Sequence, residues 1–364
     1  MGIASGAGIR PVTVVGSGPV ALVHALFSAP HRPVRLAAWP PPEGTGAGPA
    51  PVAPALAPAP IGVEAVPAPL LTLLLELGIH PRELDVEELH RRRFVAWEAI
   101  EPGRPDRPEQ RPVRAAAHLE RAALLAALWR RVWSCPDIRL VPPAAAFALA
   151  PAEGPLVDAR GRSAAAGPAG GRRLRPPRAW VASTCTLARG DRDGSLRLAA
   201  APAGYGFRLG SASHLTIGWV APGPPPRTAG QLRKALVEAG VGWLLDGVVL
   251  EADIAVRQRI ASLSAAVEPG RGGDGQGDGA LRLGDAAFAR DALASQGLAV
   301  GLSDACQSVR AERQASDGQE RTADGARRHV RSLVGVLDSC RHRDEPAWRA
   351  YAGWIRALDA RWSA

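Results

Sequence analysis

The sequence predicts an α/β protein: a Rossmann-type dinucleotide-binding domain with an inserted antiparallel sheet and added C-terminal helices. Three observations predict this fold class. A strand, a glycine turn and a helix are expected at residues 11–28, and a second strand–turn–helix pattern occupies 284–298. Between them, residues 204–220 have the alternating pattern of a β-hairpin. Two separated glycine-rich turns with a hairpin between them indicate one discontinuous nucleotide-binding domain.

Composition restricts the classes of protein and partner. The 364 residues are 46% hydrophobic, enough for two joined domains. The net charge of +9 is carried by arginine, because Lys234 is the only lysine, and the arginines are too dispersed to predict a nucleic-acid partner. We expect reduced cysteines in a cytoplasmic protein, since none of the four forms a CxxC pair. No apolar run approaches the roughly 18 residues that would predict a membrane span.

The first glycine turn follows a short β-branched strand. Gly16, Gly18 and Ala21 occupy the three small positions of a G-x-G-x-x-[GA] turn, and Pro19 opens the helix. Small residues let a pyrophosphate approach the helix N-terminus, where backbone N–H groups attract anions. We therefore expect a dinucleotide site here. The next strand, at 34–38, ends at Trp39, without the carboxylate that usually binds ribose hydroxyls.

The second turn, GDAAFARDALASQGL, is predicted to join a buried strand to a helix. Asp285, after Gly284, could accept hydrogen bonds from a ribose hydroxyl where the strand ends. The backbone N–H groups of the helix start would face an anion. This helix start comprises Ser295, Gln296, Gly297 and Leu298. The alternative is an ordinary strand-to-helix turn with an aspartate near its start.

Periodicity predicts the elements between and after these turns. Helices are expected at 70–77, 118–133, 230–245, 321–340 and 346–362. Strands are expected at 91–100, 138–141, 179–189 and 254–260, with a Pro/Arg-rich turn at 101–113 and a linker at 142–178. The hairpin at 204–220 should bury one face formed by Phe207, Leu215, Ile217 and Trp219.

Several of these segments resemble motifs of the FAD-dependent monooxygenase and tryptophan-halogenase-like flavoproteins. Residues 284–298 resemble the "GDAA…P…GxGL" segment, with Ala292 in place of the usual proline. The start of the helix at 118–133 resembles "vdRxxLxxxL", whose arginine corresponds to Arg121.

Two further segments match the family loosely. Gly62 and Glu64 resemble the strap that crosses near the flavin. Residues 179–189, AWVASTCTLAR, resemble the strand "viDATGR" that returns to the Rossmann sheet, with Ala182 and Cys185 replacing the aspartate and glycine.

The resemblance implies that FAD is bound by the two glycine turns, by Asp285 and by Arg121 at its phosphates. It implies a monooxygenase that hydroxylates an aromatic ring through a flavin hydroperoxide, because the branch includes flavoproteins that hydroxylate a protein-bound tryptophan during quinone cofactor maturation. The electron donor would be NAD(P)H or a reductase. Halogenation is disfavoured, since the W-x-W-x-I-P segment is absent and Lys234 lies outside the corresponding region. No catalytic side chain is nominated.

Two alternatives remain at this point. Trp97 and Trp219 fall on strands that would border the flavin pocket and could stack on an aromatic substrate, but core packing explains each of them equally well. The replacements at Trp39, Ala182 and Ala292 also fit a flavoprotein-like scaffold that binds FAD weakly or not at all and acts as an assembly factor.

The expected domain organisation is interleaved. The FAD-binding domain is predicted from segments 1–90, 115–190 and 280–316, the substrate domain from 91–114 and 191–265, and C-terminal helices from 317–364.

Overall fold

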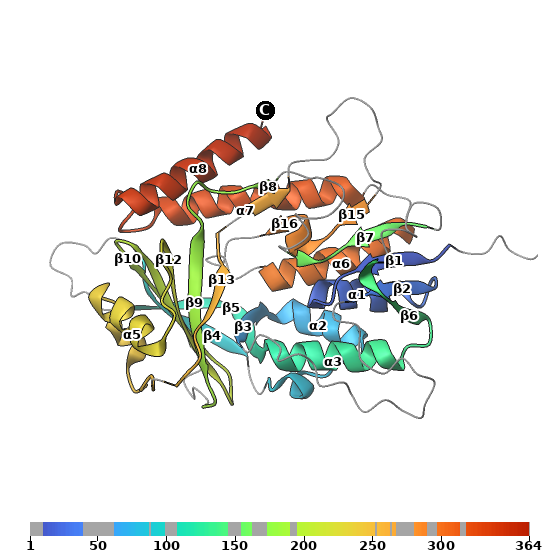
Figure 1. Ribbon diagram of the computed structural model, residues 1–364, viewed down its shortest axis with the longest axis horizontal. Coiled ribbons are helices and arrows are strands. Elements are labelled where there is room, and N and C mark those ends of the chain that lie inside the picture. The colour runs from blue at the N-terminus through green and yellow to red at the C-terminus, as the bar shows by residue number, and fades with distance from the viewer. Residues whose placement is uncertain are drawn as a thin grey trace, which may run out of the picture.

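A computed structural model describes most of the chain and shows two large sheets beside one another (Figure 1). The described residues are 10–38, 62–86, 89–98, 108–144, 154–161, 173–189, 195–251, 253–262, 264–266, 280–289, 297–313 and 318–363. Within these ranges, no helix combines the length and the apolar character that crossing a membrane would need.

The first sheet has five strands, all parallel. Their order is β15 (Ala280–Arg282), β7 (Leu156–Asp158), β1 (Val12–Val15), β2 (Val34–Ala37) and β6 (Ile138–Val141). Their short apolar sequences suit a sheet that is covered by other elements. Because β1 lies at the centre and the chain continues to both sides of it, its C-terminal end is a topological switch point, where α/β folds bind ligands.

Four helices pack on one face of this sheet and share a core with Val12 and Val14 of β1. They are α1 (Pro19–Ser28), α2 (Ala68–Glu76), α3 (Arg121–Ser134) and α6 (Gly297–Arg313). Figure 1 shows them grouped beside the parallel strands. The predicted helices after the two glycine turns are therefore present, and they lie in the same layer.

The second sheet has eight strands and is mostly antiparallel. Its order is β13 (Arg257–Ile260), β9 (Trp180–Leu187), β12 (Leu215–Pro222), β11 (Gly204–Gly210), β10 (Leu196–Ala201), β4 (His90–Ala96), β5 (Glu109–Glu120) and β3 (Val63–Pro67). Only the β10–β4 pair is parallel. Three short strands, β16 (Phe288–Ala289), β14 (Ser264–Ala266) and β8 (Arg173–Leu174), form a third sheet.

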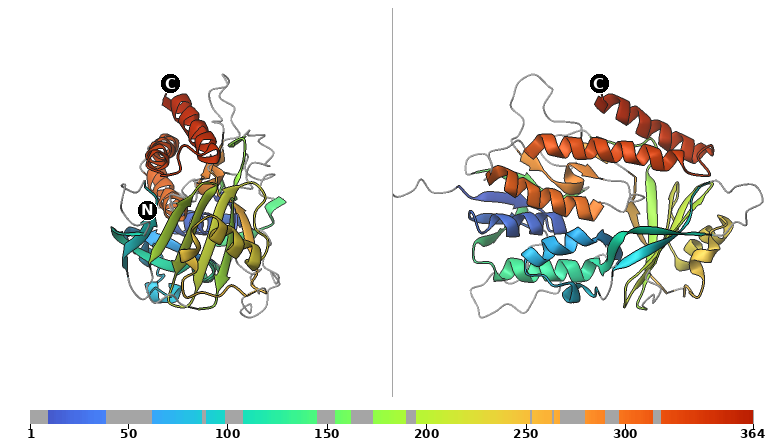
Figure 2. Two further views of the ribbon diagram at one scale, coloured as in Figure 1. Left: turned by 90° about the vertical axis from the view of Figure 1, so that its left-hand side faces the viewer. Right: turned by 180° about the vertical axis from the view of Figure 1, so that it is seen from behind.

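Helices cover both faces of the eight-stranded sheet. The short helix α5 (Ala229–Glu238) and the 3-10 turn η3 (Gly242–Leu245) pack on one face. The helices α7 (Gly318–Asp338) and α8 (Pro346–Ser363) pack on the other. Figure 2 shows α7 running past both sheets, with α8 folded back over the second. Two further 3-10 turns are η1 (Pro81–Leu84) and η4 (Gly284–Ala286).

An aromatic cluster attaches α8 to the second sheet. Trp348 is 1% exposed, and its indole Nε1–H donates to the carbonyl of Ala201 at 2.8 Å. Its ring meets Trp97 edge-on at 5.4 Å and Trp180 at 4.8 Å, the geometry that aromatic pairs prefer. This packing explains the aromatic periodicity of the C-terminal segment.

Two predictions for the middle of the chain are wrong. Residues 109–120 form β5, the longest strand in the described part of the chain, not the end of a turn, and α3 begins at Arg121 instead of residue 118. The β-branched pattern that usually marks a strand is missing there, and pairing with β3 and β4 determines its conformation. Residues 142–178 are not a linker, since they contain β7 and β8.

The predicted return strand is also corrected. Residues 180–187 form β9, which pairs with β12 and β13 in the eight-stranded sheet and not with the parallel sheet. Segments 1–90 and 115–190, assigned to the nucleotide-binding domain, thus each contribute a strand, β3 and β9, to the second sheet.

In the hairpin of β11 and β12, Phe207 faces α7 and α8, whereas Leu215, Ile217 and Trp219 face α5. A side chain on Gly218 would lie 2.3 Å from the Phe207 ring, so this glycine makes room for the phenylalanine.

We expect Trp348→Ala to lower the free energy of unfolding by about 3–5 kcal/mol, because it leaves a cavity in the aromatic cluster. Trp348→Phe should lose about 1–2 kcal/mol, since it keeps most of the volume but leaves the Ala201 carbonyl unpaired. Val237→Ala, at a side chain that is 55% exposed, is the control and should change little. Urea unfolding followed by tryptophan fluorescence measures all three; equal midpoints would show that the cluster does not support the fold.

Candidate functional site

The candidate site is the C-terminal edge of the parallel sheet around β1. The strand ends at Gly16, whose φ of 141° is a conformation that L side chains rarely adopt. A Cβ at Gly16 would lie 2.6 Å from the carbonyl oxygen of Ala159, which follows β7. The first small position of the turn is therefore required by the close approach of two neighbouring strand ends.

Gly18 has a different environment. A Cβ at this position would meet nothing within 4 Å, so the space beside it is open. Gly18 is the N-cap of α1, without a side-chain cap, and Pro19 follows at the first position of the helix. Because no acidic residue lies in the first turn, the positive end of the helix faces this space uncompensated. This arrangement fits an approaching phosphate.

The helix α6 starts beside α1. A Cβ at Gly301 would lie 2.8 Å from the Val20 side chain, and one at Gly284 would lie 3.0 Å from it. These two glycines let α6 and the turn η4 pack tightly on the first turn of α1. Leu298 packs on the shared core. The first turn of α6 itself has no acidic residue, so the site contains a second helix N-terminus.

Asp285 lies near the start of α6. It lies in η4 directly after β15 and is half-buried. Its carboxylate Oδ1 is 4.0 Å from the position of a Cβ on Gly297, where α6 begins. The residues Trp39, Ala292, Ser295 and Gln296 lie outside the described residues.

Arg121 is the first residue of α3, and its surroundings differ from those of a solvated surface arginine. Its backbone N–H donates to the Gly62 carbonyl at 2.9 Å, and its guanidinium Nη1 donates to Glu64 Oε1 at 3.1 Å. Its Nε is buried without a hydrogen-bond partner among the described residues. The strap residues predicted by resemblance thus lie against Arg121.

Sequence analysis missed Asp158 and Arg160. Asp158 ends β7 next to β1, is buried, and accepts two hydrogen bonds from the Arg160 guanidinium at 2.9 and 2.8 Å. Residues 156–162 read LVDARGR, which fits the family's return-strand motif better than the segment at 179–189. The earlier segment was overlooked because it lies within an Ala/Gly/Pro-rich stretch.

Ala182 and Cys185 are therefore not replacements of site residues, since they lie in the eight-stranded sheet. Burial raises the pKa of the Cys185 thiol to about 11, which keeps it protonated at neutral pH.

Trp97 and Trp219 do not border one pocket. Trp97 is 5% exposed, lies in the cluster under α7 and α8, and donates its Nε1–H to the Val336 carbonyl at 3.0 Å. Trp219 is 6% exposed and packs under α5 on the opposite face of the sheet. Both are core residues, the alternative that the sequence left open.

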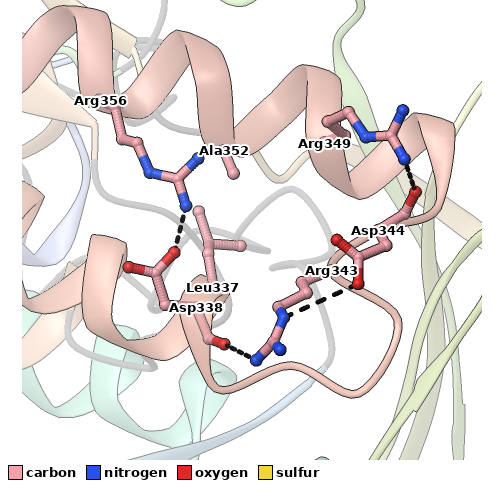
Figure 3. A pocket seen from close by; sticks show the side chains of 7 residues that line it. All are labelled: Leu337, Asp338, Arg343, Asp344, Arg349, Ala352 and Arg356. Carbon is pink, nitrogen blue, oxygen red and sulfur yellow. Dashed lines mark hydrogen bonds and ion pairs between the residues drawn. The ribbon is translucent and has the colours of Figure 1, made fainter.

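A hollow of about 390 Å³ lies elsewhere, at the turn between α7 and α8. Figure 3 shows its charged side chains paired with one another: Arg356 with Asp338, Arg343 with Asp344 and with the Asp338 carbonyl, and Arg349 with the Asp344 carbonyl. Because this lining is polar and its charges are paired, the hollow does not fit an aromatic substrate.

Among the described residues, no group of three or more metal-ligating side chains is present.

Comparison with known proteins identifies the fold. No family model and no curated protein matches the chain. The solved structure of QhpG, a peptidyl tryptophan dihydroxylase essential for tryptophylquinone cofactor biogenesis, is similar with a TM-score of 0.64 and 20% identity over 96% of this chain and 79% of that one. The myxobacterial chondrochloren halogenase CndH is similar with a TM-score of 0.60 and 17% identity, over 97% of this chain and 90% of that one.

The flavin-dependent halogenase Xcc4156 from Xanthomonas campestris has a TM-score of 0.64 and 13% identity, covering 96% of this chain and 82% of that one. The chain thus has the fold of flavin-dependent halogenases and of the peptidyl tryptophan dihydroxylase, and the predicted fold class is confirmed.

The two glycines of the first turn should respond differently to substitution. Gly16→Ala should lower the free energy of unfolding by at least about 1–3 kcal/mol, because the added Cβ strains the backbone and collides with the Ala159 carbonyl. Gly18→Ala should stay within about 0.5 kcal/mol of the parent, since its Cβ enters open space. Urea unfolding without added cofactor measures the difference; equal losses would contradict the geometry of this turn.

Proposed function

We propose that this chain binds one FAD non-covalently and is an FAD-dependent monooxygenase that hydroxylates an aromatic ring. One observation carries the proposal: the first turn of α1, open at Gly18 and without an acidic residue, packs against α6 and η4, and Asp285 of η4 lies beside the start of α6. A dinucleotide offers both the phosphates that such N-termini attract and the hydroxyls that a carboxylate accepts from.

The roles of the chain's own residues follow from this placement. The turn of Gly16, Gly18, Pro19 and Ala21 would receive the diphosphate, and Asp285 would accept hydrogen bonds from cofactor hydroxyls. The start of α6, at Gly297 and Leu298 with the preceding Ser295 and Gln296, would lie along the same ligand. When bound, FAD supplies the redox chemistry with O2, while the protein binds, orients and excludes water.

An indole side chain, within a peptide or protein, is the substrate we propose. Support comes from the likeness to the peptidyl tryptophan dihydroxylase, which extends over 96% of this chain. NAD(P)H or a separate reductase is proposed as the electron donor. No catalytic side chain is assigned.

FAD titration followed by flavin fluorescence tests the cofactor. We expect Asp285→Ala to weaken FAD binding roughly ten-fold or more, the effect of losing a charge-assisted hydrogen bond. Arg121→Ala should weaken it less, because Glu64 already accepts from this guanidinium. Gly18→Ala should weaken binding without loss of stability, since its Cβ occupies the space that the ligand approaches.

Heat denaturation should release the flavin, as a non-covalent cofactor requires. A wild-type protein that does not bind FAD would contradict the proposal and favour the alternative, an assembly factor without enzymatic turnover. Equal affinity in wild type and Asp285→Ala would instead remove Asp285 from the site.

The substrate is tested by mass spectrometry after incubating the reduced protein and O2 with free tryptophan, a tryptophan-containing peptide and a simple phenol. We expect one or two oxygen atoms to be added to the peptide's indole. A matched peptide with phenylalanine in place of tryptophan should remain unmodified. Turnover confined to phenols, or chlorine incorporation when chloride is supplied, would refute the proposed substrate.

A further inference from the structure

The strand β13 lies at one edge of the eight-stranded sheet. It pairs with β9 on one side, and no strand in the described part of the chain pairs with its other side. Gln258 and Ile260 are exposed, and Ile260, at 45%, is among the large apolar side chains that face solvent. The edge of a sheet presents unpaired N–H and C=O groups and is therefore a template for an added strand.

The register of β13 shows which backbone groups lie at this edge. The strand is antiparallel to β9, with Arg259 opposite Ala182, and the Ala261 N–H donates to the Trp180 carbonyl at 2.8 Å. Antiparallel strands exchange hydrogen bonds at every second residue pair, so the backbone of Arg259 also bonds to β9. The N–H and C=O groups of the residues on either side of Arg259, at 258 and 260, therefore point to the open edge.

This edge lies close to the candidate site along the chain and in space. After Ile260 the chain enters β14, where Ser264 pairs with β16, the strand that follows the turn η4 and Asp285. The Arg259 Nη2 lies 3.5 Å from the position of a Cβ on Gly62, directly before β3. A ligand along the outer edge of β13 would therefore lie at the junction of the two large sheets.

Positive charge dominates this part of the junction. Arg257 and Arg259 lie on β13 itself, and burial, followed by the positive charge of Arg121, lowers the pKa of Arg259. Glu64 opposes this shift, but it already forms an ion pair with Arg121 at 3.1 Å. Because the three guanidinium groups outnumber this carboxylate, the edge attracts an acidic partner.

We propose that the outer edge of β13 binds the substrate polypeptide as an added, extended strand in which acidic residues flank the tryptophan. The proposal rests on the peptide substrate proposed above. Main-chain hydrogen bonds to residues 258 and 260 would supply affinity, and the arginines would favour acidic neighbours of the tryptophan. Residues opposite one another in adjacent strands share a sheet face, so the peptide side chain opposite Arg259 would project toward Gly62.

A scan of methylated peptides tests the backbone contacts with wild-type protein. The probe is a fluorescein-labelled peptide with one tryptophan flanked by glutamates, and fluorescence polarisation without flavin measures its affinity. Because only every second amide of an added strand bonds to β13, N-methyl groups on successive amides should weaken binding alternately. We expect losses of roughly ten-fold at one alternate set and little change at the other. Uniform losses, or none, would overturn the proposal.

Charge and the edge itself are tested separately. The same peptide with lysines in place of the glutamates should bind more weakly, and equal binding would remove the arginines from the proposal. Ile260→Pro deletes an outward-facing N–H, a change that sheet edges tolerate, and should weaken peptide binding roughly ten-fold. Ile260→Val keeps the N–H and should bind like wild type. A folded Ile260→Pro variant with unchanged affinity would contradict the docking edge, and if this variant does not fold, the scan on wild type decides.

The remaining outcomes separate this proposal from the function proposed above. If the peptide binds with the alternating pattern but the protein does not bind FAD, the proposed function is wrong and the docking edge stands. If FAD binds and the indole is oxidised while the scan shows no alternation, the function stands and the docking edge is wrong. A dimer in analytical ultracentrifugation that Ile260→Pro dissociates would show that a second copy of the chain occupies the edge, which would also overturn the proposal.

Discussion

The close packing of α6 on α1 is the contact on which the candidate site depends. Val20 in the first turn of α1 lies against Gly284 and Gly301, where side chains would collide with it. Because the glycines permit this approach, the first turns of two helices from opposite ends of the chain lie side by side. Each helix N-terminus carries a fraction of a positive charge, so their closeness favours an anionic ligand at this edge of the sheet.

The second sheet limits where a substrate could lie. One face is filled by α5 and the other by α7 and α8, and the tryptophans on both faces are core residues. The described part of this sheet therefore reaches the parallel sheet through its edges. At one edge lies β3, whose neighbour β5 continues directly into α3 at Arg121; at the other edge, β13 carries Arg259 toward the strap. The junction between the sheets is the part of the fold where both can contact one ligand.

The predictions that succeeded rest on local chemistry. The helices at 19–28 and 297–313 follow glycine turns, and the helices at 318–338 and 346–363 have a regular apolar stripe. The predictions that failed concern strands with weak local preference. β5 contains Pro112, follows a Pro/Arg-rich sequence typical of turns, and is held in place by pairing with β3 and β4. β7 is only three residues long. Placing β9 in the wrong sheet followed, because periodicity does not name a strand's partner.

The sequence by itself determined the α/β class, the two glycine turns and the nomination of Asp285, because these depend on residue types at short, fixed spacing. Arg121 was nominated through the resemblance of its segment to a family motif. Only the tertiary structure decided that Asp158 and Arg160 lie at the switch point, that Trp97 and Trp219 face opposite cores, and that Arg259 stands beside Arg121. Each of these facts depends on strand pairing between segments far apart in the chain, and no local pattern encodes which segments pair.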